Sequence, residues 1–137
     1  MIDRHTPKTY ENAAEELTRA LREELLEYAG LLELLQRKQA LIFEENLAEL
    51  IKISDEISSQ QQLIQSSRHT RSYWQKLTIQ EMHEDDLPWD DMARRLPMCN
   101  QVPLQLIRIE INSLLDQIQV LLGQNQYLSR RATSPFN

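Results

Sequence analysis

Apolar residues recur every three or four positions along three long stretches of this 137-residue chain. An average step of about 3.5 residues is typical of helices that bury one side against neighbouring helices. The chain has only two glycines and five prolines, and aromatic residues make up 6% of it, which favours long uninterrupted helices over strands. The sequence therefore predicts an all-α fold, and the length fits a single helical domain over 1–137.

A pair of polar residues marks the turn between the first two helices. Asn46 stands three positions ahead of Glu49. This is the spacing of a capping box, in which each side chain accepts a hydrogen bond from the backbone N–H of the other residue. The two helices, at about 10–43 and 46–81, leave no room for a long linker. We therefore expect a long antiparallel helical hairpin.

The two arms of this hairpin differ in charge. The segment 11–56 contains twelve acidic and five basic residues, whereas 57–80 contains three basic residues and no acidic one. Folding back near residue 44 places Arg68 and Arg71 level with acidic residues 15–24. We expect ion pairs there that select the antiparallel orientation, with a solvated basic face as the alternative.

The connection after the hairpin breaks the helical pattern. A short helix is predicted at about 87–96, with Asp86 as its cap and Pro88 in its first turn. Trp89 is expected to anchor this helix on the bundle. His83 precedes three acidic residues, but consecutive side chains in a turn rarely converge on one ion, so we expect a solvated turn and no metal site.

A third long helix is predicted over about 103–131, entered through Pro103, which completes a three-helix bundle or coiled coil. Its apolar stripe has one polar step, Asn125, and further apolar residues widen it beyond a single seam. Packing against both arms of the hairpin would use much of that surface, and capture of a partner helix is the alternative. The stripe consists of Leu104, Ile107, Ile111, Leu114, Ile118, Leu121 and Leu128.

Several classes of function lack the residues they need. His5, His69 and His83 are scattered, and two glycines cannot build a phosphate-binding loop. No catalytic residue, cofactor or enzyme activity is therefore expected. A net charge of −6 argues against a nucleic-acid partner.

The sequence also bears on location. Cys99 has no second cysteine with which to form an internal disulfide, and no apolar run reaches the roughly 18 residues of a membrane span. The first residues lack the apolar core of a signal peptide. We expect a cytoplasmic protein without membrane insertion, with loose tails at about 1–9 and 132–137.

Four features follow one another along about 14–131. A Leu- and Glu-rich helix leads through Gln39, Ala40 and Leu41 to the capped turn, and a Gln- and Ser-rich helix follows. A short helix then ends at Leu96 and Pro97, and the last helix ends in the letters QNQYL. This order resembles the FlgN-type flagellar export chaperones.

The resemblance implies a small cytoplasmic all-α chaperone for type III secretion. Proteins of that family bind the helical terminal segments of the flagellar hook-associated proteins, which form the hook-filament junction. They prevent premature assembly of these clients and aid their export. The resemblance assigns no residue of this chain to an export-gate contact.

A wide apolar helix such as 103–131 can cover a client helix by mimicking its partner. The sequence leaves open which client is bound. It also leaves open whether the chain forms a homodimer through the second helix, whose apolar seam is narrow. The residues expected to bind the partner are Leu106, Ile109, Val120, Leu122, Tyr127 and Leu128.

Two other interpretations remain. A structural coiled-coil adaptor unrelated to flagella would have the same helical pattern. Leu34, Leu35 and Arg37 also resemble the first helix of the all-α chorismate mutases. That chemistry needs several cations converging in a buried pocket, because its substrate is a dianion.

Overall fold

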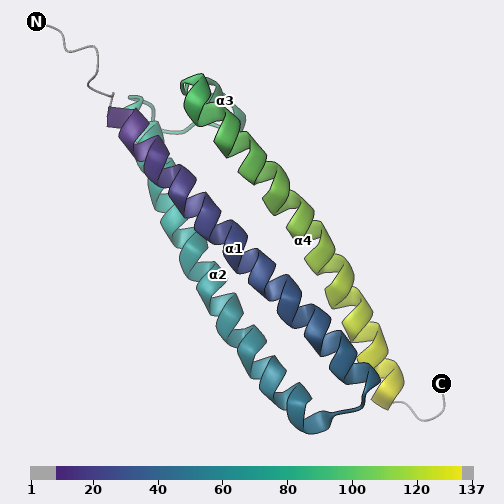
Figure 1. Cartoon of the computed structure of the whole chain (residues 1–137). Coiled ribbons are helices and arrows are strands. Elements are labelled where there is room, and N and C mark those ends of the chain that lie inside the picture. The colour runs from purple at the N-terminus through teal and green to yellow at the C-terminus, as the bar shows by residue number, and fades with distance from the viewer. Residues whose placement is uncertain (1–8, 134–137) are drawn as a thin grey trace, which may run out of the picture. The chain divides into compact units, whose positions relative to one another are not determined.

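A computed structural model describes residues 9–133, which contain four helices and no strand. The all-α prediction is thus confirmed (Figure 1). Of the expected loose tails, residues 1–8 and 134–137 lie outside the described part, whereas Thr9, Ala132 and Thr133 belong to helices. The helices are α1 (Thr9–Phe43), α2 (Leu47–Glu81), α3 (Trp89–Arg94) and α4 (Met98–Thr133).

The three long helices contribute to two compact units. Unit 1 consists of Met1–Leu25 and Ser66–Ile109, and unit 2 of Leu26–Gln65 and Glu110–Asn137. Within each unit, α1 runs antiparallel to α2 and parallel to α4 (Figure 1). Each unit therefore has a core of its own, built from one segment of each long helix.

The core of unit 2 follows the predicted apolar seams. Leu32 in α1 is only half-buried, and Leu47 is exposed because it is the first residue of α2 at the turn. Leu50, Leu114 and Leu128 are likewise half-buried, and the residues at the centre of the seams of this unit are enclosed, as helical periodicity requires. Its buried apolar residues are Tyr28, Leu31, Leu35, Ile42, Ile53, Ile57, Ile64, Ile111, Ile118 and Leu121.

Gly30 in α1 marks a close contact between helices. A Cβ at this position would lie 3.0 Å from Nε2 of Gln60 on α2. Gln60 uses the free space to donate to the carbonyl oxygen of Glu27 at 2.9 Å and to its carboxylate at 2.6 Å. The glycine thus admits a polar cross-link in the Gln- and Ser-rich part of the seam, where apolar contacts are sparse.

The turn between α1 and α2 closes through backbone bonds. The N–H of Asn46 donates to the carbonyl of Leu41 at 3.2 Å, and that of Glu45 to Ile42 at 3.1 Å. This is a Schellman motif, and it places Glu45 in the left-handed region at φ 55°. The Asn46 side chain accepts from the Glu49 N–H at 3.2 Å, so the predicted cap is present. The carboxylate of Glu49 instead pairs with Lys52 at 3.3 Å.

Unit 1 holds a buried ion pair between α1 and α2. Its core is formed by small and apolar side chains, and the carboxylate of Glu24 is buried among them. Nε of Arg71 donates to Glu24 at 3.0 Å, which is one of the cross-helix pairs expected from the charge pattern. The buried apolar residues of this unit are Ala13, Ala14, Leu17, Ala20, Leu21, Ile79, Met92, Leu96, Leu104 and Ile107.

The short helix differs from the prediction. α3 begins at Trp89, and the cap position is Pro88, so Asp86 is not the cap. The cause is Pro88 itself, because the residue before a proline is driven out of the helical region. Met92 is fully buried and anchors α3, whereas Trp89 is half-buried and lies 5.7 Å from the Arg108 guanidinium.

The last helix begins five residues earlier than predicted, at Met98 and not at Pro103. The carbonyl of Pro97 accepts from the N–H of Asn100 at 2.9 Å and of Gln101 at 3.0 Å. The Gln101 side chain donates back to the carbonyls of Arg94 and Leu96. These bonds stabilise the early start against the cost of Pro103, which removes one backbone hydrogen bond in the second turn and crowds the carbonyl of Cys99.

The left-handed residue in the first turn gives a stability prediction. We expect Glu45→Gly to raise the free energy of unfolding by about 0.5–1 kcal/mol, because glycine adopts positive φ without steric cost. Glu44→Gly is the matched control, since Glu44 lacks a positive φ and should lose about 0.5 kcal/mol. Urea unfolding measures both, and equal effects of the two substitutions would contradict the explanation.

The buried ion pair gives a second prediction. Arg71→Met should lower the free energy of unfolding by about 2 kcal/mol, because it leaves the buried Glu24 carboxylate without its partner. This loss is smaller than is usual for a fully buried ion pair, since the Arg71 side chain is 32% exposed. Arg19→Met removes an exposed pair with Glu16 at 2.6 Å and should change stability by less than about 0.5 kcal/mol. Thermal or urea unfolding compares the two, and similar losses would show that burial of Glu24 is not the cause.

Candidate partner-binding surface

In unit 1, α4 presents apolar side chains on its outward side. Leu106 and Ile109 are both more than half exposed, whereas Leu104 and Ile107 are buried. Residues three or four apart share one side of a helix, so Leu106 and Ile109 are neighbours on the surface. Sequence reasoning placed both of them in the partner-binding set.

The same side continues toward the start of α4. Met98 and Val102 are exposed, at four-residue steps before Leu106. Sequence reasoning missed both residues because it began the helix at Pro103. The signal that could have found them is Pro97, which can end α3 and start α4 at once.

In unit 2, the predicted residues of α4 separate into two groups. Val120 is 60% and Tyr127 59% exposed, and their seven-residue separation puts them on the same side of the helix. Leu122 is 43% exposed but lies about 200° around the helix from Val120, so it cannot share a contact strip with it. Leu128 is half-buried. Val120 and Tyr127 are therefore the stronger candidates.

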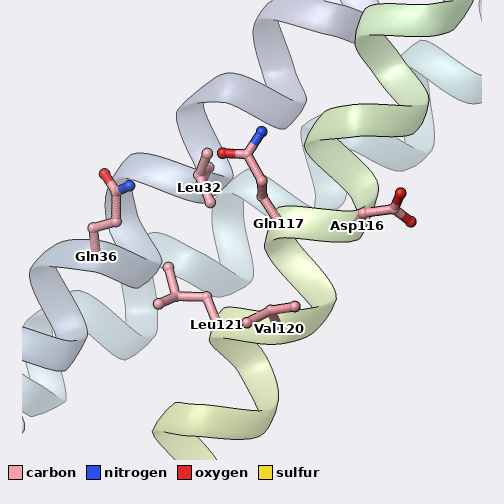
Figure 2. A pocket seen from close by; sticks show the side chains of 6 residues that line it. All are labelled: Leu32, Gln36, Asp116, Gln117, Val120 and Leu121. Atoms are coloured by element: carbon pink, nitrogen blue, oxygen red, sulfur yellow. The ribbon is translucent and has the colours of Figure 1, made fainter.

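Val120 also lines an open groove between α1 and α4 within unit 2. The groove has a volume of about 320 Å³ and is lined by Leu32, Gln36, Asp116, Gln117, Val120 and Leu121. Figure 2 shows Leu121 facing α1, Gln117 reaching toward Leu32, and Asp116 directed away from α1. Its apolar floor and its amide rim suit a single apolar side chain of a partner flanked by polar groups.

A buried amide fixes α4 against α1 in this unit. Nδ2 of Asn125 donates to the carbonyl of Leu35 at 3.0 Å, and the Gln39 amide donates to Gln124 at 3.0 Å. Asn125 is 3% exposed, and its Oδ1 has no hydrogen-bond partner within 9–133. Asn125, the one polar position in the predicted apolar stripe, thus sets the register of α4 against α1, and this register positions Val120 and Leu121.

Other candidate sites from the sequence do not assemble. Arg37 is exposed, pairs with Glu56 at 3.6 Å, and borders a groove with Glu33 and Asp55, so its surroundings are acidic and do not suit a dianion. His83 has φ 64° and closes a Schellman motif after α2. In the part of the chain that the structure describes, no three His, Cys, Asp or Glu side chains form a group that could hold a metal.

No helix within the described range is long and apolar enough to cross a membrane. Comparison of the chain with protein-family models, curated proteins and solved structures found no match.

Asn125 provides a test of how the surface is positioned. We expect Asn125→Asp to lower the free energy of unfolding by at least about 2 kcal/mol, because it removes the donor to Leu35 and buries a carboxylate. Asn125→Leu, of similar size, should stay within about 1 kcal/mol of the wild type, since it also removes the unpaired Oδ1. Chemical unfolding measures both variants, and an Asp variant as stable as the Leu variant would contradict the buried contact.

Proposed function

We propose that this protein is a chaperone of the FlgN type that binds the helical terminal segment of a flagellar hook-associated protein. It covers that segment until export and so prevents premature assembly of the hook-filament junction. One observation carries the proposal: α4 has outward apolar side chains in both units in addition to the separate set that fills the cores. The order of motifs in the sequence supports the same assignment.

The physical reason is the assembly mode of such a client. A terminal helix that assembles through an apolar stripe must have that stripe covered beforehand, and an amphipathic helix is readily covered by another helical surface. Leu106 and Ile109 in unit 1 have the spacing that a helical partner needs, and so, taken separately, do Val120 and Tyr127 in unit 2.

The outward side chains alone are too few for tight binding. Full burial of such a side chain contributes roughly 1.5–3 kcal/mol, and these four are already nearly half covered. The sum over all four is about 3.5–7 kcal/mol before the cost of association, which corresponds to a dissociation constant no lower than roughly 10 µM. The groove beside Val120 must therefore contribute as well, and the client helix lies along α1 and α4 in unit 2.

A chaperone of this kind acts in the cytoplasm and delivers its client to the type III export gate. Both statements belong to the proposal, and no residue of the chain is assigned to the gate. The coiled-coil adaptor differs from the chaperone in one respect that can be measured. It has no affinity for the terminal segment of a hook-associated protein.

The test measures, by calorimetry, the affinity of the protein for a synthetic C-terminal helical segment of a hook-associated protein. We expect Val120→Glu to weaken binding at least about tenfold, because the contact would bury a carboxylate in an apolar groove. Gln119→Glu adds the same charge at an exposed neighbouring position and should leave the affinity within about twofold.

Two results would count against the proposal. If the wild-type protein does not bind the segment, the result favours the interpretation as a coiled-coil adaptor. Equal affinity of the Val120 and Gln119 variants would show that the client lies elsewhere on the chain. Circular dichroism of both variants verifies that the helices remain intact.

A further inference from the structure

The turn between α1 and α2 carries a cluster of exposed apolar side chains that the proposed function does not use. Phe43 is 70%, Leu47 74% and Ile51 68% exposed. Leu47 and Ile51 are one helical turn apart on α2, and Phe43 is the last residue of α1. With Glu44 and Glu45 between the helices, these residues form what we name the tip patch.

The tip patch is acidic. The segment 43–56 contains five acidic residues and one lysine, and Lys52 is already paired with Glu49 at 3.3 Å. Glu44 and Glu45 are exposed, and neither forms an ion pair with any residue in the described range. The Schellman motif and the Asn46 cap hold the backbone of the turn, so little ordering is needed when the patch binds.

A second patch of opposite charge lies at the end of α4. Arg130 and Arg131 are exposed, and no acidic residue occurs between 117 and 133. The Arg131 guanidinium lies 5.9 Å from the ring centroid of Tyr127, which is itself exposed. We name Tyr127, Arg130 and Arg131 the end patch.

Both patches lie at the same end of unit 2. The bonds from Asn125 to Leu35 and from Gln39 to Gln124 place the last turns of α4 beside the last turns of α1. Because α1 and α4 are parallel in this unit, the end of α4 reaches the level of the turn (Figure 1). One end of the unit thus presents an acidic apolar patch next to a basic aromatic one.

We propose that this end of unit 2 binds a second copy of the chain in a two-fold symmetric dimer. When a two-fold axis passes between the patches, each tip patch meets the end patch of the other copy, and the interface is self-complementary. Phe43 and Leu47 of one copy are covered by Tyr127 of the other, while Glu44 and Glu45 meet Arg130 and Arg131. A second copy is the occupant because it supplies both halves of the charge match, which an anionic membrane does not.

The two patches are small, so the dimer is weak. Interfaces below about 1,200 Å² belong to transient complexes, and we expect a dissociation constant on the order of 10 µM. The dimer forms without a client, so its test does not depend on the proposed function.

Sedimentation velocity over a range of concentrations, with the full chain and no client, tests the proposal. Wild type should dimerise, and raising the salt from about 0.05 M to about 0.5 M should weaken the dimer several-fold. Glu44→Lys with Glu45→Lys should abolish it, as should Arg130→Glu with Arg131→Glu. An equimolar mixture of these two variants should form a heterodimer, because opposite charges then face each other at both contacts.

Matched controls make the outcome decisive. Glu15→Lys with Glu23→Lys changes the net charge by the same amount at exposed positions of unit 1 and should leave the dimer unchanged. Phe43→Ser with Leu47→Ser should weaken it at least about tenfold. Arg130→Gln with Arg131→Gln repeats the basic-end test without placing acidic residues at a helix C-terminus.

Four results would overturn the proposal. The first two are a wild type that stays monomeric at all concentrations and a mixture of the two charge variants that stays monomeric. The third is a dimer whose dissociation constant falls as salt is raised. The fourth is a loss of dimerisation in the Glu15→Lys, Glu23→Lys control as large as that in the tip variant. Binding of wild type, but not of the tip variant, to vesicles of anionic lipid would assign the tip patch to a membrane instead.

Discussion

A buried polar contact in each unit fixes two helices in register, and the position of the surface residues on those helices depends on it. Seams of leucine and isoleucine are nearly uniform, so a slide of one turn exchanges one apolar contact for another at little cost. A buried polar group does not tolerate such a slide, because it must keep its partner. Glu24 keeps Arg71 in unit 1, and Asn125 keeps the carbonyl of Leu35 in unit 2.

Most of the fold could be predicted because its signals are local and periodic. The apolar period of α1 and α4, the cap at Asn46 and the charge match at Arg71 involve residues whose spacing fixes the geometry. The start of α4 could not be predicted in the same way. Pro97 and Pro103 are both acceptable near a helix start, and the choice depends on the Gln101 side chain reaching back to the end of α3.

The sequence predicted that α4 carries a candidate partner-binding surface, but it did not predict fully which residues form it. Counting apolar residues indicates that α4 has more apolar surface than its core needs, yet the count does not say which side is outward. Val120 and Leu122 are equally apolar, and only the register set by Asn125 places Val120 on the groove. Leu47 fits the apolar period of α2, yet as the first residue of that helix it is exposed.

The two proposed surfaces meet at Tyr127, and this has a thermodynamic consequence. A client helix that reaches the end of α4 covers the ring that the second copy of the chain would cover. The client and the second copy of the chain therefore compete for this side chain, and each lowers the affinity of the other by the same factor. Because a client of higher affinity would displace a weak dimer, the proposed dimer would belong to the protein without a client and the monomer to the protein with a client bound. In the proposed dimer the end patch of the other copy covers the tip patch, so a client that occupies the end patch would leave the tip patch exposed.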